Sequence, residues 1–204
     1  STLVPKWQQL TLHPLSATTT AQIQQNCPVH VSTLEANVGH NWRAFATSNT
    51  GYWQNRQSQL VNTVRRKKKK LLQLGADIQI HRQLTPELLS AYWHIYQHSW
   101  KQAEPSTDFI NWLLQFASEQ GQLRLGLLRI DGAPVAFQFW LVQQQQAAIV
   151  KLSQDQAFDA LSPGTVLMAA MIDDVMTQDG VTELDFLTGN DDYKAQWMDQ
   201  CLPL

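Results

Sequence analysis

The chain has 204 residues, of which 44% are apolar and 16% are charged, and its formal net charge is -2. A chain of this length can bury roughly 70% of the surface that it exposes when unfolded, so it can form a core without staples. The small net charge gives no support to nucleic-acid binding through an overall basic surface. Cys27 and Cys201 lie far apart, in no metal-ligand spacing, which argues against a disulfide framework or zinc site and favours a reducing cytoplasm. No apolar run reaches the roughly 20 residues that span a bilayer.

The first part of the chain is weakly patterned. Residues 1–51 are interpreted as a connecting region or the remnant of a preceding half-domain, with a short strand-like run at Trp7–Leu12 and a possible small helix at Thr18–Asn26. Residues 52–204 form the predicted domain. A helix is expected from Tyr52 to Gly75, because apolar residues recur at helical spacing, namely Leu60, Val61, Val64, Leu71 and Leu72.

One strand and two helices are predicted next. The strand covers Asp77–His81, and Thr85 is placed to cap a helix that has Pro86 at its first position. The second helix begins near Ser106 and stops at Gly121. Helical spacing predicts two buried stripes, Leu88, Leu89, Tyr92, Trp93 and Tyr96 in the first helix and Phe109, Ile110, Leu113, Leu114 and Phe116 in the second. The aromatic residues at 92, 93, 96, 100 and 112 are expected to form core between these helices.

Three consecutive strands and one further strand complete the pattern. Leu123–Ile130 and Pro134–Val142 flank the hairpin signal Asp131-Gly132, and Ala147–Ser153 extends them into an antiparallel meander. A helix then runs to Gly180, followed by a strand at Val181–Leu187 and a helix at Tyr193–Met198. The order is strand, two helices, three strands, helix, strand, helix, which predicts an α+β fold with a mixed central sheet.

This order resembles the GNAT acyltransferase fold, in which a mixed sheet is splayed open where acyl-CoA enters. Short motifs are similar to the branch that contains cellulose-biosynthesis-associated (CelD-like) acetyltransferases and Fem-type aminoacyltransferases. They are Gly132–Ala136, Ser162-Pro163-Gly164, Leu184-Asp185-Phe186 with Gly189, Tyr193-Lys194 and Trp197, and the basic helix Asn55–Leu71. The resemblance covers Tyr52–Trp197. It implies an N-acyltransferase that moves an acyl group from acyl-CoA to a primary amine by direct attack, without a metal.

Two features depart from that branch. Its members usually carry two related halves, and this chain is too short for both, so a missing half-domain or a partner chain is expected. GNAT domains also end with two further strands, yet seven residues follow Trp197. We therefore expect a partial fold, or strands supplied by Trp7–Leu12 or by another chain.

Ser162, Gly164 and Thr165 are the predicted binding residues for the CoA pyrophosphate. They come between a strand and an apolar helix, and a helix N-terminus offers unpaired N–H groups and partial positive charge. Gly164 would let the backbone approach the phosphate closely. The usual GNAT loop, with Arg or Gln before two spaced glycines, is absent. The alternative is an ordinary helix start, where Ser and Pro are favoured.

Lys194, Asp185 and Tyr193 are the predicted catalytic residues. The tetrahedral intermediate of acyl transfer carries a negative oxygen, which the charge of Lys194 could stabilise. The resemblance implies that this lysine lies near the reacting carbonyl and that Tyr193 could protonate the departing thiolate. Asp185 could position the acceptor amine or act as its base. The alternative is a structural Asp185–Lys194 ion pair, with Tyr193 and Trp197 in the core.

Six adjacent cations, Arg65–Lys70, invite an anionic partner. Neighbouring helical residues point about 100° apart, so the run forms no single basic face, and Lys67 or Lys68 must lay its stem across apolar surface or point at something anionic. The alternatives are a solvated helix or contact with tRNA, acyl carrier protein, a CoA phosphate or a half-domain. His94 and His98 could share a metal, but no third ligand is evident.

Two other functions remain open beside acyl-CoA-dependent transfer. One is a Fem-type transferase that uses aminoacyl-tRNA, suggested by the basic run and the same C-terminal motifs. The other is a non-catalytic GNAT-fold binding domain, suggested by the absent CoA loop. The sequence specifies neither the acyl group nor the acceptor.

Overall fold

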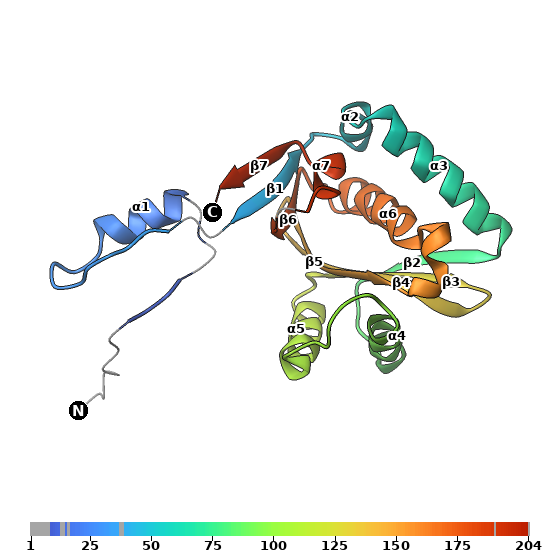
Figure 1. The fold of residues 1–204 in the computed structure, drawn as a ribbon, viewed down its shortest axis with the longest axis horizontal. Coiled ribbons are helices and arrows are strands. Elements are labelled where there is room, and N and C mark those ends of the chain that lie inside the picture. The colour runs from blue at the N-terminus through green and yellow to red at the C-terminus, as the bar shows by residue number, and fades with distance from the viewer. Residues whose placement is uncertain (1–8, 13–14, 16, 37–38, 190, 204) are drawn as a thin grey trace.

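A seven-stranded mixed sheet, ordered β2-β3-β4-β5-β6-β1-β7, forms the centre of the molecule. It is seen in a computed structural model that describes residues 9–12, 15, 17–36, 39–189 and 191–203. Figure 1 shows α2, α3, α6 and α7 on one face of the sheet and α4 and α5 on the other. The predicted α+β architecture is confirmed.

The predicted meander forms most of the sheet. Strands β2 (Ala76–His81), β3 (Leu123–Ile130), β4 (Ala133–Gln143) and β5 (Gln146–Gln154) are successive antiparallel neighbours, and β6 (Glu183–Thr188) joins β5 in parallel. The parallel step follows from the crossover through α6 (Pro163–Gln178), because parallel neighbours need a long connection. A short 3₁₀ helix, η1 (Gln156–Leu161), leads into α6.

Two further strands complete the sheet from opposite ends of the described chain. β7 (Gln200–Pro203) follows α7 (Lys194–Trp197), and β1 (His40–Phe45) lies between β6 and β7, antiparallel to both. The expectation that Trp7–Leu12 or another chain supplies these strands is wrong. Residues 9–12 form no regular element, residues 7 and 8 lie outside the described ranges, and His40–Phe45 takes the place instead.

The helix expected over Tyr52–Gly75 is two helices, α2 (Asn49–Gln54) and α3 (Ser58–Gln73). Ser48 caps α2 by accepting a hydrogen bond from the Gly51 N–H at 3.1 Å. The chain breaks at Arg56, which is buried, forms an ion pair with Asp199 and lies 4.6 Å from the centre of the Tyr52 ring. After this break the basic helix α3 packs against α6.

Helices α4 (Pro86–Gln97) and α5 (Thr107–Glu119) enclose a second core with β3 and β4. Thr85 caps α4 as predicted, accepting a hydrogen bond from the Leu88 N–H. The face that α5 buries carries Ile110, Leu114, Ala117 and Ser118. The expectation that the neighbouring aromatic residues are core is wrong for those that lie off this face, because they are 40% to 56% exposed, namely Trp100, Phe109, Trp112 and Phe116.

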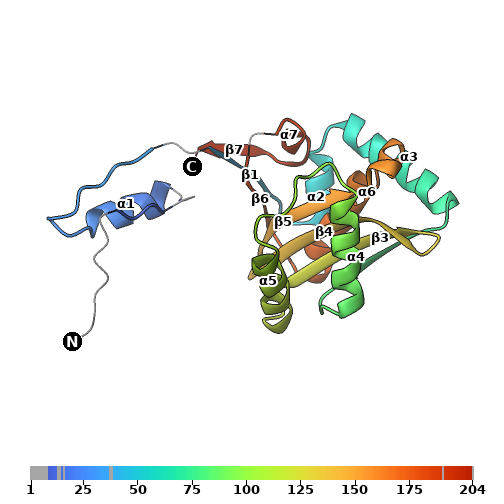
Figure 2. The same cartoon turned by 60° about the horizontal axis from the view of Figure 1, so that its bottom comes forward.

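Helix α1 (Ala17–Gln25) has no buried residue and lies apart from the sheet in two views (Figures 1 and 2). Among the helices of the described ranges, none is long and apolar enough to cross a membrane.

Candidate active site

The sheet opens between its two central parallel strands. Pairing of β5 with β6 covers Gln146–Ala148 against Glu183–Asp185 and ends there. Beyond this point β5 continues beside β4, whereas Thr188 of β6 pairs with Asn41 of β1. The inner edges of both strands therefore leave backbone groups available to an extended ligand, at a point where ligands of open sheets commonly bind.

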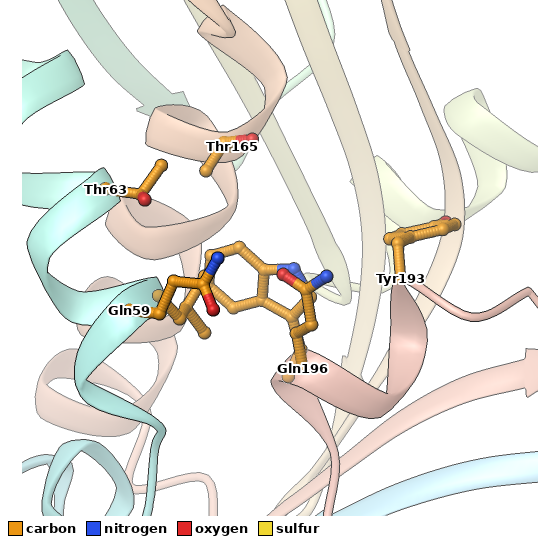
Figure 3. Close-up of a pocket in the computed structure, with 7 residues that line it drawn as sticks. Gln59, Thr63, Thr165, Tyr193 and Gln196 are labelled. Atoms are coloured by element: carbon orange, nitrogen blue, oxygen red, sulfur yellow. The ribbon is translucent and has the colours of Figure 1, made fainter.

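A cleft of about 160 Å³ lies between α3, the start of α6 and α7 (Figure 3). Thr165 and Tyr193, predicted from separate motifs, both line it. No sequence motif predicts the other polar lining residues, Gln59, Thr63 and Gln196. Gln59 and Thr63 are four residues apart on α3, beside the buried Leu60, so only the packing of α3 against α6 assigns them to the cleft.

The start of α6 is built from strained and closely packed backbone. Ser162 adopts a left-handed conformation, with φ of 53°, and its side chain makes no capping hydrogen bond. The Gly164 N–H donates to Gln154 Oε1 at 2.8 Å, and Gln138 Nε2 donates to the Gly164 carbonyl at 3.0 Å. A Cβ at position 164 would lie 2.7 Å from Gln154 Oε1. An amide oxygen thus already occupies the position where we expected an oxygen of the phosphate.

Lys194 is buried and is hydrogen-bonded to two backbone carbonyls. It is 4% exposed, and its Nζ donates to the Thr188 carbonyl at 2.9 Å and to the Phe186 carbonyl at 3.3 Å. Asp191 Oδ2 lies 3.7 Å away. Burial lowers the pKa of Lys194, while Asp191 and, more weakly, Asp185 oppose that shift. The result is a desolvated ammonium group beside the opening.

Tyr193 lies at the mouth of the cleft, 40% exposed, with its ring edge-to-face on Phe186 at 5.5 Å. Burial of its hydroxyl, helped by the charge of Asp191, raises the pKa of Tyr193 to about 12. The phenol therefore keeps its proton at neutral pH and is able to donate it.

Asp185 is held by β1 rather than by Lys194. Its Oδ2 lies 3.1 Å from Arg43 Nη2 and accepts hydrogen bonds from Asn41 and Gln146 at 3.3 and 3.4 Å. Its Oδ1 accepts the Leu187 N–H at 2.8 Å. The alternative of a direct Asp185–Lys194 ion pair is therefore wrong, since Arg43 is the partner.

The basic run on α3 is largely solvated. Arg65, Arg66 and Lys68–Lys70 are exposed, whereas Lys67 is half-buried and its Nζ donates to the Ala160 carbonyl at 2.7 Å. Of Lys67 and Lys68, Lys67 is therefore the one that turns toward the rest of the protein. The His94 and His98 rings are 4.5 Å apart, but within the described ranges no three potential metal ligands come together.

Residues 58–195 match the profile of the family described as Acetyltransferase (GNAT) domain. The chain belongs to this GNAT family. Members of the family use acyl-CoA as a co-substrate, which fits the strand opening and the glycine at the start of α6. The cleft of about 160 Å³ is smaller than usual ligand pockets, so it would hold only a part of CoA.

Solved structures agree with this GNAT fold. FemX superposes with a TM-score of 0.67 at 9% identity, over 91% of this chain and 66% of FemX. A conserved protein of unknown function from Bacteroides thetaiotaomicron superposes with a TM-score of 0.63 at 13% identity, over 92% of this chain and 65% of that protein. L-PGS from Bacillus licheniformis superposes with a TM-score of 0.53 at 11% identity, over 82% of this chain and 59% of L-PGS. The GNAT chain thus spans 59% to 66% of these proteins, and at such identities the likeness shows the fold alone. No curated protein sequence matches it.

Proposed function

We propose that this GNAT domain transfers an acyl group from acyl-CoA to a primary amine by direct attack. The observation that carries the proposal is the opening between β5 and β6, with the start of α6 on one side and Lys194 on the other. The opening admits an extended thioester arm, and the buried cation beside it suits the negative charge that develops during acyl transfer.

In this proposal Ser162, Gly164 and Thr165 bind the pyrophosphate of acyl-CoA. The first N–H groups of a helix favour an anion, and the missing side chain of Gly164 permits close approach. Gln154 would then have to release the Gly164 N–H, to which it is hydrogen-bonded. The Gln154 Nε2 donates to Asp159 Oδ1 at 2.6 Å. The Gln154 side chain therefore keeps one partner when the phosphate takes the place of its Oε1.

The reaction forms a C–N bond and breaks the C–S bond of the thioester. A neutral amine attacks the carbonyl carbon, and its surplus proton passes to solvent water as the tetrahedral intermediate collapses, while solvent restores the proton that Tyr193 gives up. Lys194 stabilises the negative oxygen of that intermediate, and Tyr193, which stays protonated, supplies a proton to the thiolate.

Asp185 was predicted either to position the acceptor or to act as a base, and we assign it a positioning role. Both carboxylate oxygens already have partners, which leaves neither oriented to remove a proton from an amine. By accepting the Leu187 N–H, Asp185 fixes the peptide group that joins Phe186 to Leu187. That group carries the Phe186 carbonyl, one of the two backbone carbonyls that bind Lys194. Asp185 therefore acts through the position of Lys194.

Acyl transfer from acetyl-CoA to a panel of primary amines tests the proposal. We expect Lys194→Ala to lower kcat by about 10² or more, as loss of one oxyanion-stabilising group does in other enzymes. Lys68→Ala, which removes an exposed lysine of α3, is the matched control and should retain full activity. Thermal unfolding of both variants separates lost catalysis from lost structure. Full turnover by folded Lys194→Ala would contradict the catalytic role.

A Fem-type reaction with aminoacyl-tRNA is the second candidate, and one observation favours it. The exposed cations of α3 lie on the helix that also contributes Gln59 and Thr63 to the cleft. Filter binding of charged tRNA tests it with Arg65, Arg66 and Lys68–Lys70 neutralised and Lys67 retained, because Lys67 holds the Ala160 carbonyl. Binding that weakens steeply with salt and in the variant supports this candidate. Failure of the intact protein to bind at low salt excludes it.

The third candidate is a binding domain without catalysis, favoured by the Gln154 side chain at the expected phosphate position. Thermal unfolding with CoA distinguishes it. A ligand at 100 times its Kd stabilises a protein by roughly 2.7 kcal/mol, so an acyltransferase should show a clear shift. The absence of a shift with CoA and acetyl-CoA would favour the binding domain.

A further inference from the structure

Charged side chains on the face covered by α4 and α5, together with others at the sheet opening, act on Lys101, which lies between α4 and α5. We call this group the lysine cluster; it consists of Lys101, the Lys151–Glu104 pair, and the Lys194–Asp191 pair at the opening. Lys151 of β5 stands opposite Phe139 of β4, and Phe139 belongs to the core beneath α4 and α5. Lys151 thus lies on the other side of β5 from the start of α6.

Lys151 already has its counter-ion. Its Nζ lies 2.6 Å from Glu104 Oε2, which also accepts a hydrogen bond from the Tyr96 hydroxyl at 3.3 Å. Burial would raise the pKa of Glu104, but the hydrogen bond and charge of Lys151 outweigh it, so the pKa is lowered and Glu104 stays ionised. The opposite charges of Lys151 and Glu104 therefore cancel within the cluster.

Lys101 has no such partner. It is half-buried in the segment between α4 and α5, its Nζ lies 5.7 Å from the centre of the Trp100 ring, and within the described ranges no acceptor is in hydrogen-bonding distance of its ammonium group. Burial lowers the pKa of Lys101, and the charges of Lys151 and Lys194 act in the same direction, against Asp191 and Glu104. A cation held partly out of water without a hydrogen-bonded anion is unfavourable until an anion joins it.

Two buried hydroxyl groups beside the cluster also lack partners. Tyr92 is 0% and Ser153 is 1% exposed, and neither hydroxyl has a hydrogen bond in the described part of the chain. Both lie next to Phe137, since the Tyr92 ring is 4.0 Å from its ring and Ser153 stands opposite it in the strand register. The Tyr92 ring lies 6.2 Å from the ring of Tyr96, whose hydroxyl donates to Glu104 of the cluster. Because buried polar groups are normally hydrogen-bonded, these two are suited to polar groups of a ligand.

We propose that the lysine cluster is the acceptor subsite and that the acceptor is a primary amine carrying an anionic group, a carboxylate, sulfonate or phosphate, which binds Lys101. The inference rests on the proposed acyl transfer, because acyl-CoA on the α6 side leaves the α4/α5 side for the amine. Lys194 lies at the opening that joins the two sides. Tyr92 and Ser153 then bind polar atoms between the anionic group and the amine.

Matched amine pairs that differ in the anionic group test this subsite. We would use β-alanine against propylamine and O-phosphoethanolamine against ethanolamine, measuring Kd by calorimetry with and without CoA, and kcat/KM with acetyl-CoA. Wild type should bind each anionic member about tenfold or more tightly, the gain expected of a charge-assisted hydrogen bond. Lys101→Met should abolish that preference and leave the Kd of CoA unchanged. Lys101→Arg should retain it, and so should Lys68→Met.

Equal affinity of wild type for both members of every pair, or a preserved preference in Lys101→Met, would overturn the subsite. If Lys101→Met does not fold, competition between sulfate and the anionic amines for wild type tests the subsite instead. The absence of competition would overturn the subsite. The proposed function fails separately, when CoA does not bind. Amine selectivity of the CoA-free protein still decides the subsite in that case.

Discussion

Lys194 owes its position to a small set of contacts that lie within ten residues of chain. Gly189, with φ of 128°, leaves room for the ammonium group, because a Cβ there would lie 2.8 Å from Nζ. Leu187 is held in a left-handed conformation, with φ of 56°, by the hydrogen bond from its N–H to Asp185. Such backbone costs of order 1–3 kcal/mol and persists where the surroundings enforce it. The loop between β6 and α7 is thus shaped around one cation.

The first prediction concerns the alkaline limit of activity. Burial lowers the pKa of Lys194 below its ordinary value of 10.5, whereas the pKa of Tyr193 is raised to about 12. As the pH rises, Lys194 therefore loses its proton first, and kcat should fall through the lowered pKa of Lys194. Lys194→Arg keeps its charge to higher pH and should move that limb upward. A pH profile of kcat with saturating substrates measures this shift in both proteins. If wild type and Lys194→Arg lost activity over the same alkaline range, the titrating group would be another residue.

The second prediction concerns the start of α6. Gly164→Ala adds a methyl group where a phosphate is proposed to approach, 2.7 Å from Gln154 Oε1. We expect CoA to bind about tenfold more weakly, the loss of roughly one good hydrogen bond. Affinity for pantetheine, which lacks the pyrophosphate, should not change. Alanine is the better helix former, so the stability of α6 should not fall through helix propensity. Equal losses for both ligands would place the pyrophosphate elsewhere.

The sequence could predict the residues whose chemistry is written in short motifs. Thr165 and Tyr193 come from two such motifs, and the cleft brings them together. Gln59 could not be predicted, because its role depends on how α3 packs against α6. Lys101 carries no motif either; its lack of a partner follows from the fold of the segment between α4 and α5. The catalytic roles of Lys194, Asp185 and Tyr193 remain predictions.

At the scale of elements, apolar periodicity located nearly every helix and strand but not which aromatic residues each helix buries. On α5 the rings of Phe109, Trp112 and Phe116 stack on one another on the outer side, 6.0 and 5.1 Å apart. They have helical spacing, as core residues do, but the smaller Ala117 and Ser118 face the sheet. The sequence does not predict the break at Arg56 either, where the ion pair with Asp199 joins residues 143 apart.

The third prediction concerns the end of α6, which an ion pair fastens to β3. Arg124 donates to both carboxylate oxygens of Asp179, at 2.8 and 2.7 Å, and both side chains are largely buried. Asp179→Asn should lower the free energy of unfolding at pH 7 by about 3 kcal/mol, because it leaves a buried guanidinium group without its charge partner. Chemical denaturation measures the difference.

The pH dependence of that difference follows from the pKa of Asp179. Burial would raise it, but the hydrogen bond and charge of Arg124, with help from Arg82, outweigh burial and lower it. A lowered folded pKa contributes stability above the unfolded value of about 3.9, lost as pH falls through the folded value. The gap between wild type and variant should therefore narrow in acid. Asp174→Asn is the control: burial raises the pKa of Asp174 and its partner Arg82 is more exposed, so the effect should be small.

At the scale of the whole molecule, the central sheet takes strands from both ends of the described chain. Strand β1 separates β6 from β7, so two neighbouring positions of the sheet depend on a segment that precedes the matched family region. The sequence His40–Phe45 alternates poorly and is short, and nothing local predicts its pairing with strands about 140 residues away. The resemblance indicated that two strands were unaccounted for, but only the fold shows which residues form them.

The fourth prediction tests whether β1 belongs to the same cooperative unit as the rest of the sheet. Arg43 lies 2.9 Å from Glu183 and 3.1 Å from Asp185, and it is the only arginine that joins β1 to β6 within the described ranges. Arg43→Ala leaves the buried carboxylate of Asp185 without its cation and should lower the free energy of unfolding by about 2 kcal/mol, since Arg43 is itself partly exposed.

Arg43→Ala combined with Asp185→Asn should recover part of that loss, because the two side chains are coupled. Unfolding of all variants, followed by both tryptophan fluorescence and far-UV circular dichroism, should give coincident single transitions if β1 is integral to the sheet. An early transition confined to β1, with the main midpoint unchanged, would instead make β1 an appendage. In that case the Arg43–Asp185 contact could not fix the loop that holds Lys194, and Arg43→Ala should leave acyl transfer intact.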